Sequence, residues 1–256
     1  MEPDVGAAPP RRIVSLVPST TESVCVLGAA DRLVGCTRYC TEPAAALAGV
    51  ATIGGTKNPD LEAVLALAPD LVLGNAEENR AEDLDALAAR APTLVQTPRT
   101  VAEAVGDLRA LAARLGVPEA VAPIAARIDA LLAEPPPEQG ARVYYAIWRK
   151  PWMTVGADTF IADVLRCCGA RPLAAPADRG ASRYPALTPA EAVAAGVDIA
   201  LLASEPWEFD EAQRREVAAD RLFGDAAVRL VDGRDFCWHG VRMADGLQRA
   251  RAALAR

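Results

Sequence analysis

Short apolar runs alternate with longer segments of helical periodicity along most of the chain. Residues 13–17 and 199–203 are largely apolar stretches of strand length, and glycine or polar residues bound each of them. The segments between such runs place apolar residues at the spacing of an amphipathic helix. Strands that alternate with helices predict a parallel sheet, so we expect an α/β fold.

Local signals predict where the first helices begin. Ser19 is followed three residues later by Glu22, which predicts a capping box at the start of the first helix, and Gly28 is expected to close that helix. Asn58 and Pro59 are expected to be the N-cap and the first position of the helix that precedes a strand at 71–73.

The pattern changes after the first hundred residues. From residue 101 to about 133 nearly every position is a good helix former, with one break near "GVPE", and "EPPPEQG" (134–140) predicts a linker. Alternation then resumes, with strands expected at 143–147, 199–203 and 228–231 and helices at 159–168, 189–195, 211–219 and from Val241 on. We predict an α/β lobe over 11–100, a helical connector over 101–133 and a second α/β lobe over 141–256.

A faint internal repeat supports two related lobes. "LEAVLALAPDLVLGNAEE" (61–78) is similar to "AEAVAAGVDIALLASEP" (190–206), with Glu-Ala-Val opening a helix, an aspartate before the strand and an acid after it. One gap is needed to align the two segments, so an accidental match is the alternative.

Composition and charge narrow the class of partner. The chain of 256 residues carries a net charge of -7, which argues against a nucleic-acid partner because that would need a basic face. No apolar run approaches the ~20 residues of a membrane span. The start "MEPDVGAAPPRR" lacks the basic and apolar regions of a signal peptide. The chain as written is therefore expected in the cytoplasm, or in the periplasm if a leader has been removed.

Signatures of catalysis are missing from the sequence. It contains no GxSxG, GxxxxGK[ST], GxGxxG after a strand, or HExxH motif. His239 is the only histidine, which excludes a His-dependent triad or a multi-histidine metal site within one chain. Cys36 and Cys40 form a single CxxxC pair, a weak metal signal, and packing is expected of Cys25, Cys167 and Cys168. These features predict a binding protein rather than an enzyme.

Aromatic residues are concentrated in the second half of the chain. Eleven of the twelve lie between Tyr144 and Trp238, and several directly follow predicted strands: Trp148, Trp152, Trp207 and Trp238. Ligands of open parallel sheets bind outside the carboxyl ends of the strands, where aromatic rings stack well on a flat ligand. We therefore expect these side chains to line a pocket; packing between lobes is the alternative.

Polar residues in the same loops complete the candidate set. Arg149 and Arg183 have aromatic neighbours, and a guanidinium can bind carboxylates or stack on rings. Tyr184 lies in a stretch of loop composition, and Asn75 follows a strand of the first half. The predicted ligand-binding residues are Tyr39, Asn75, Trp148, Arg149, Trp152, Arg183, Tyr184, Trp207, Trp238 and His239.

Two long segments resemble a known family. "RIVSLVPSTTESVCVLGAADRLVGCTRYC" and "IGGTKNPDLEAVLALAPDLVLGNAEEN", with the connector and second lobe after them, are similar to the helical-backbone (class III) substrate-binding proteins of ABC importers. These proteins bind cobalamin, iron-siderophores, haem and some metal ions. "SLVPSTTE" and "DLEAVLALAPDLVL" look most like the cobalamin-binding branch.

The resemblance implies a fold, a function and a partner. The fold would be two Rossmann-like α/β lobes joined by a long backbone helix, with the ligand held between the lobes and no catalysis. Glu62 matches the glutamate with which such proteins dock on a transporter arginine, so an ABC permease is the implied partner. The tryptophans expected in the first-lobe loops are absent here, and Ile53 and Asn75 stand at about those places. A monomer is expected.

His239 has two alternative roles in this scheme. Imidazole is a suitable axial ligand for cobalt or haem iron, since the macrocycle supplies the other donors. A histidine near a helix start can equally be a hydrogen-bonding residue of the pocket wall. The predicted ligand is a corrinoid such as cobalamin; haem or a ferric siderophore, and a tetrapyrrole chelatase activity, are the alternatives.

Overall fold

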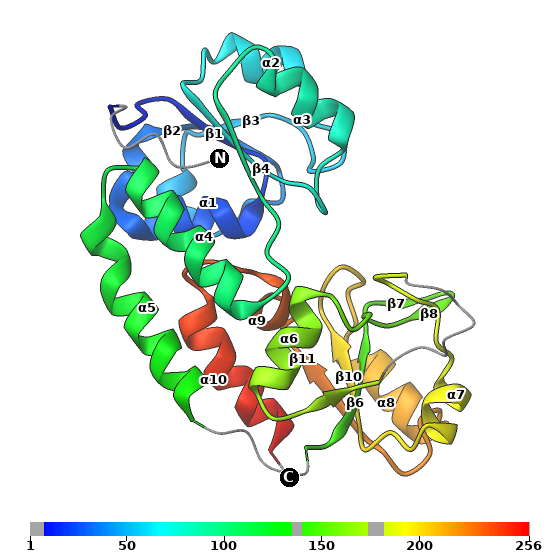
Figure 1. The fold of residues 1–256 in the computed structure, drawn as a ribbon. Coiled ribbons are helices and arrows are strands. Elements are labelled where there is room, and N and C mark those ends of the chain that lie inside the picture. The colour runs from blue at the N-terminus through cyan, green and yellow to red at the C-terminus, as the bar shows by residue number, and fades with distance from the viewer. Residues whose placement is uncertain (1–7, 135–139, 174–181, 256) are drawn as a thin grey trace. The chain divides into compact units, whose positions relative to one another are not determined.

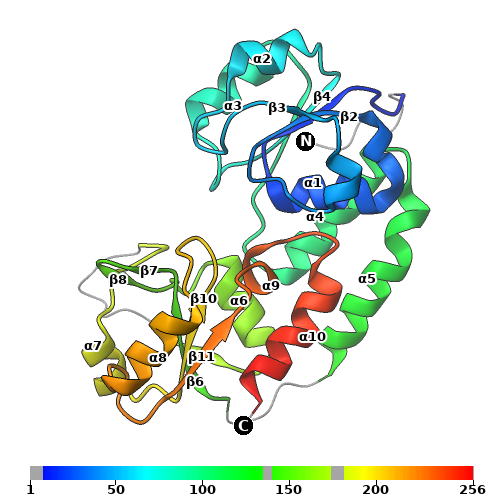
Figure 2. The same ribbon diagram turned by 180° about the vertical axis from the view of Figure 1, so that it is seen from behind.

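The computed structural model describes residues 8–134, 140–173 and 182–255 (Figures 1 and 2). Its contacts divide the chain into two compact units. Unit 1 contains the chain up to Pro98 together with Ala102–Arg127 and His239–Arg242, and unit 2 contains Arg99–Val101, Ile128–Trp238 and Met243–Arg256. Most of the predicted linker, residues 135–139, lies outside the described residues. Within the described ranges, no helix combines the length and the apolarity that crossing a bilayer requires.

Unit 1 is built on a five-stranded parallel sheet of order β3-β2-β1-β4-β5. The strands are β1 (Ile13–Ser15), β2 (Leu33–Cys36), β3 (Ala51–Thr52), β4 (Leu71–Asn75) and β5 (Thr93–Gln96). Helices of this half of the chain are α1 (Pro18–Val24), continued by a π-helical turn (Cys25–Ala29), then α2 (Leu61–Ala66), α3 (Ala81–Ala88), α4 (Val101–Arg114) and α5 (Pro118–Ala133), with 3-10 turns at Ala30–Arg32 and Ala44–Leu47.

Alternate residues of the central strands serve two cores. Ile13 of β1 and Leu71 of β4 face a cluster with residues of α1 and α4, whereas Val14 and Val72 face a cluster with residues of α2 and α3. The two helix layers lie on opposite faces of the sheet (Figures 1 and 2). Because both faces are covered, the strands are apolar throughout, which is the run-like pattern that predicted them.

The predicted starts of α1 and α2 are wrong. α1 begins at Pro18, because proline suits the first helical position, and its N-cap Val17 makes no side-chain hydrogen bond. Ser19 and Glu22 therefore lie inside the helix and do not form a capping box. α2 begins after Asp60, whose Oδ1 accepts the Ala63 N–H at 3.0 Å, so Asn58 is not its cap.

Unit 2 has a four-stranded parallel sheet of order β11-β10-β6-β9. The strands are β6 (Arg142–Ala146), β9 (Arg171–Pro172), β10 (Ile199–Ala203) and β11 (Ala227–Val231), and a separate antiparallel hairpin joins β7 (Trp148–Arg149) to β8 (Trp152–Met153). The helices are α6 (Phe160–Cys167), α7 (Pro189–Ala194), α8 (Glu211–Ala219), α9 (Arg234–Cys237) and α10 (Met243–Leu254). The sequence patterns did not predict the hairpin or α9.

The two sheets repeat one connection pattern. In unit 1 the strands β1, β4 and β5 are neighbours, and in unit 2 the strands β6, β10 and β11 are neighbours in the same order. α2 precedes β4 as α7 precedes β10, so the two segments of the sequence repeat fold alike. This agreement supports real pseudo-symmetry over an accidental match.

The predicted connector contains two helices. α4 and α5 are separated at residues 115–117, where Gly116 adopts a φ of 71°, and this is the break that "GVPE" predicts. Gly116 also ends α4, since its N–H binds the Ala113 carbonyl at 3.0 Å.

The corrected helix start gives a direct test on stability. Asp60→Ala should lower the free energy of unfolding by about 1 kcal/mol, because it removes the cap of α2. Asn58→Ala, two residues away and exposed, should change it by less than about 0.5 kcal/mol. Chemical denaturation of the two variants measures both values, and a larger loss for Asn58→Ala would restore the sequence-based start.

Candidate functional site

Unit 2 gathers aromatic side chains where its strands end. Because β6, β10 and β11 are parallel neighbours, their carboxyl ends meet at one edge, and Trp148 and Trp207 follow two of them. The two indoles meet edge to face, with ring centroids 4.9 Å apart and an interplanar angle of 74°. Trp148 is 37% exposed. The Nε1 of Trp207 is buried and has no hydrogen-bond partner among the described residues.

Trp152 is linked to this pair through Phe209, which also packs against Trp207. Its ring stacks on Phe209 with centroids 5.8 Å apart and meets Phe223 edge to face at 5.6 Å. The Arg149 guanidinium lies 6.0 Å from the centre of the Trp152 ring and binds Glu216 at 2.6 Å. Trp152 and Trp207 are both half-buried and pack against the core of the unit, so Trp148 is the most exposed ring of the cluster.

A second predicted pair lies beside the hairpin. Residues 182–187 run antiparallel to β8, with the Gly156 N–H bound to the Arg183 carbonyl at 2.7 Å and a bridge between Met153 and Ala186. This pairing places Leu187 opposite Trp152 and Arg183 opposite Gly156, so Arg183 and Tyr184 lie further along the paired segment. The Arg183 guanidinium binds Asp158 at 3.3 Å. Four predicted residues are linked by ring contacts in this region of unit 2: Trp148, Arg149, Trp152 and Trp207.

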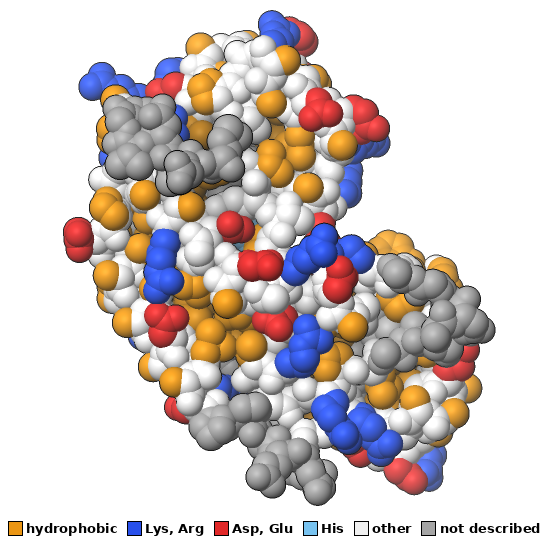
Figure 3. All heavy atoms as spheres, in the orientation of Figure 1, with side chains coloured by type: hydrophobic (Ala, Val, Ile, Leu, Met, Phe, Trp, Pro, Cys, Tyr) orange, Lys and Arg blue, Asp and Glu red, His pale blue; other side chains and the backbone are white. Residues whose placement is uncertain are grey.

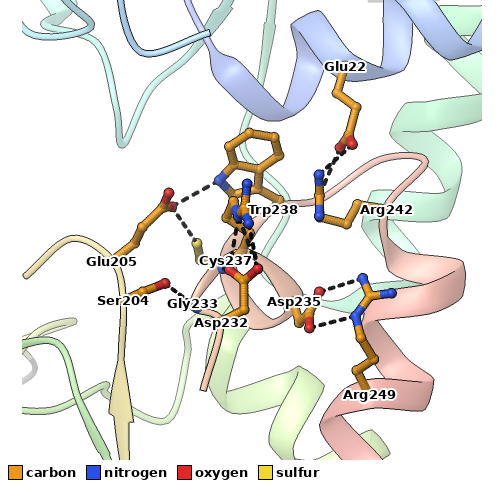
Figure 4. Close-up of polar contacts among 11 residues, drawn as sticks. Glu22, Ser204, Glu205, Asp232, Gly233, Asp235, Cys237, Trp238, Arg242 and Arg249 are labelled. Carbon is orange, nitrogen blue, oxygen red and sulfur yellow. Dashed lines mark hydrogen bonds and ion pairs between the residues drawn. The ribbon is translucent and has the colours of Figure 1, made fainter. Parts of the chain in front are cut away.

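Trp238 extends this region across the sheet edge through a carboxylate. Its Nε1 donates to Glu205 Oε2 at 3.0 Å, and the Cys237 thiol lies 3.6 Å from the same oxygen (Figure 4). Burial raises the pKa of Glu205, and these two hydrogen bonds oppose that rise. Trp238 itself is only 7% exposed. Glu205 was not among the predicted site residues, although the acid that follows each strand of the internal repeat was a signal for it.

His239 lies in unit 1 although it follows Trp238 directly. Its side chain is 7% exposed, and its Nε2 is 3.2 Å from Asn75 Nδ2 and 3.5 Å from Ser19 Oγ. The Asn75 amide is oriented by its other end, because Oδ1 accepts the N–H groups of Glu77 and Glu78. Asn75 therefore donates to Nε2, and the neutral ring carries its proton on Nδ1. A metal could bind Nε2 only if Asn75 released it.

The residues after His239 are fixed in the same unit. Arg242 forms a two-pronged ion pair with Glu22 of α1, at 3.0 and 2.6 Å (Figure 4), and the Val241 N–H binds Ser23 Oγ at 3.2 Å. Gly240 has a φ of 105°, and a Cβ there would lie 2.2 Å from Ser23 Oγ, so only glycine fits. Glu22, which the sequence predicted to cap the first helix, therefore binds a segment that is distant in the sequence.

Tyr39 and Glu62, the other predicted residues of unit 1, make none of the described contacts with Asn75, His239 or Arg242. Tyr39 is 54% exposed, and the Arg38 guanidinium lies 5.2 Å from its ring centre. The Glu62 side chain is 85% exposed and lies 3.4 Å from Arg90. Acidic and basic side chains are interspersed on the face that Figure 3 draws.

The cysteines are packed rather than assembled for metal. Cys36 and Cys40 are both in the core of unit 1, and Cys40 Sγ lies 3.1 Å from Thr21 Oγ1 and 3.2 Å from Thr37 Oγ1. The Cys36 thiol and these hydroxyls lower the pKa of Cys40 to about 6, against the cost of burial. Among the described residues, no group of three or more His, Cys, Asp or Glu side chains could hold a metal ion.

A small cavity lies elsewhere on unit 2. It has a volume of about 220 Å³ and is lined by Arg166 of α6, by both residues of β9, and by residues of the adjoining segments, among them Val155 and Leu173. Typical small-molecule sites measure ~300–1,000 Å³, and none of the predicted ligand residues lines this one. We therefore place the candidate site at the aromatic cluster instead.

Comparison with known proteins gives a consistent set of relatives. The family described as "periplasmic binding protein" matches residues 13–228. The vitamin B12-binding protein of Vibrio campbellii is 28% identical over 184 residues, which cover 69% of this chain and 65% of that protein. The chain thus spans less than two thirds of the length of this relative.

Solved structures show the same fold. The periplasmic vitamin B12 binding protein BtuF of Vibrio cholerae matches with a TM-score of 0.79 and 21% identity, over 96% of this chain and 97% of that one. The periplasmic haem-binding protein BhuT, solved with two haems, matches with a TM-score of 0.77 and 25% identity, over 97% of this chain and 100% of that one. The predicted two-lobed α/β architecture is confirmed at the level of fold class.

The buried histidine predicts a pH dependence of stability. Burial lowers the pKa of His239 from 6.5 to about 4, so the unfolded chain binds more protons than the folded one between these values. Stability should therefore fall as pH drops from about 6.5 towards 4, by on the order of 3 kcal/mol. His239→Gln should remove that part of the decline in urea titrations at several pH values. An equal decline in both proteins would contradict the assignment.

Proposed function

We propose that this chain, which belongs to the periplasmic binding protein family, binds a corrinoid or a closely related metal chelate as the substrate-binding protein of an ABC importer. The observation that carries the proposal is the tryptophan pair Trp148 and Trp207 at the carboxyl edge of the unit 2 sheet. The family consists of binding proteins, and the activity proposed here is binding without catalysis. The relative from Vibrio campbellii, named as a vitamin B12-binding protein, supports this choice of ligand.

The physical argument is one of shape and exposed apolar area. A fully covered aromatic side chain buries roughly 150–250 Å², and Trp148 still exposes 37% of its surface. Because the two indoles meet at 74°, a flat macrocycle can stack on the face of one ring and contact the edge of the other. Trp207 packs on Phe209, which stacks on Trp152, and Trp148 packs on Trp207, so little side-chain freedom is lost when a ligand arrives. A rigid aromatic surface of this kind favours a planar ligand over a flexible one.

Haem is the second candidate, and the solved haem complex of the BhuT neighbour favours it. Protein-bound haem iron usually takes a donor from the protein. In this chain the only histidine has its Nε2 bound to Asn75, so a direct metal contact would cost that hydrogen bond. Cobalamin needs no such donor when it brings its own axial ligands, and His239 can then keep its hydrogen bond to Asn75.

Retention of aquocobalamin after desalting is the first test. The protein should keep the ligand, and Trp148→Ala and Trp207→Ala should each weaken binding at least tenfold, or about 1.4 kcal/mol. Val193→Ala, an exposed apolar residue of α7, is the matched control and should leave the affinity unchanged.

The spectrum of the bound ligand separates the roles of His239. A shift that reverts in His239→Ala would establish a contact between His239 and cobalt. Retention of the ligand without a shift would show that His239 does not bind the cobalt. Failure to retain aquocobalamin combined with retention of haem would replace the corrinoid by the second candidate. Metal insertion into a metal-free macrocycle would contradict the non-catalytic assignment and favour a chelatase.

Docking on a permease is the part of the proposal that concerns Glu62. Its exposure leaves the carboxylate available for an arginine of the partner. Glu62→Lys should leave ligand affinity unchanged and should abolish ligand uptake by vesicles that carry the cognate permease. Glu82→Lys, an equal charge change on the exposed start of α3, should transport normally. Normal uptake with Glu62→Lys would remove this residue from the docking surface.

A further inference from the structure

We infer that Glu205 makes the unit 2 site selective for ligands whose periphery carries carboxamides and against ligands that carry carboxylates at the same place. This inference rests on the proposed function and names a residue outside the predicted set. It follows from the position of Glu205, from the partners of its two oxygens, and from the charges that surround it.

Glu205 stands at the centre of the candidate region. It follows β10 by two residues and precedes Trp207 by two, so it shares a loop with one member of the tryptophan pair. Its backbone packs closely on the next turn, because a Cβ on Gly233 would lie 2.8 Å from the Glu205 nitrogen. The Gly233 N–H in turn binds Ser204 Oγ at 3.0 Å (Figure 4). These contacts fix the base of the side chain.

The two carboxylate oxygens have different surroundings. Oε2 accepts the Trp238 indole N–H at 3.0 Å and lies 3.6 Å from the Cys237 thiol. Oε1 accepts no hydrogen bond from the residues that the structure describes. The residue is half-buried and its other oxygen is bound, so Oε1 is an acceptor held in a fixed position.

The cation whose charge acts on Glu205 is already paired with another acid. This cation is Arg234, which binds both oxygens of Asp232, at 2.9, 3.1 and 2.7 Å. Arg183 binds Asp158, which it shares with Arg99. Arg149 binds Glu216, a carboxylate that Lys150 also stabilises. A ligand carboxylate beside Glu205 would therefore meet a like charge without a cation committed to it.

Carboxamides and carboxylates differ in just this respect. An amide N–H₂ donates and can satisfy Oε1, whereas a carboxylate only accepts and repels it. The periphery of cobalamin and cobinamide consists of carboxamides, and that of haem ends in two propionates. Glu205 thus distinguishes two flat metal macrocycles that an aromatic surface alone would accept equally.

Two corrinoids with the same ring provide the test. Dicyanocobinamide carries side-chain amides and dicyanocobyrinic acid carries carboxylates, and cyanide occupies the cobalt of both. The wild-type protein should bind the amide form at least tenfold more tightly at pH 7. Glu205→Gln should reduce this ratio at least threefold, because it removes the repelling charge. Glu208→Gln removes one charge from an exposed position of the same loop and should leave the ratio unchanged.

The outcomes separate the inference from the proposed function. An unchanged ratio in Glu205→Gln, with tight binding of dicyanocobinamide by the wild type, would overturn the role of Glu205 alone. Failure of the wild type to bind either corrinoid would overturn the corrinoid assignment and the inference with it. Glutamine has the size of glutamate and an oxygen for the Trp238 N–H, so near-ultraviolet circular dichroism of the variant should match the wild type.

Discussion

The hydrogen bond between Asn75 and His239 is the constraint on which much of this arrangement depends. It joins the carboxyl end of β4 to a segment that lies 164 residues further along the chain. Because Asn75 must donate, the imidazole stays neutral, and its burial is tolerated without a counter-charge. The ion pair of Arg242 with Glu22 and the close fit of Gly240 on Ser23 complete the attachment. Neighbours in sequence are thereby assigned to different units, with Trp238 in unit 2 and His239 in unit 1.

The division explains why one short motif contributes two kinds of contact. Trp238 meets Glu205 within unit 2 and so belongs to the aromatic region. His239 meets Asn75 and Ser19 and belongs to the support of unit 1. A metal role for the histidine and a stacking role for the tryptophan are separate questions, although "CWHG" presents both residues together.

The two sheets share a connection pattern but not a chemistry. Each has a central strand preceded by a short helix and followed by an acidic residue, yet only unit 2 places tryptophans after its strands. In unit 1 the corresponding edge holds a buried amide and a neutral imidazole. The apolar surface available to a flat ligand thus comes from one half of a pseudo-symmetric chain. Arg149, Arg183 and Arg234 of that half each bind an acid, and Glu205 offers there a half-buried carboxylate whose Oε1 has no protein donor among the described residues.

The sequence by itself determined the central strands of both sheets, most helices, the pseudo-symmetric order and the gathering of aromatics after strands. These follow from periodicity and from the rule that parallel strands end at one edge, and both are properties of local segments. Tertiary structure alone decided the starts of α1 and α2, the burial of His239 and the place of Glu205. Some of these features depend on a partner that is distant in sequence, as Glu22 depends on Arg242. Others depend on a choice between two nearby capping residues, as α2 uses Asp60 in place of Asn58. Local pattern cannot supply such a partner, because its energy appears only after the chain has folded.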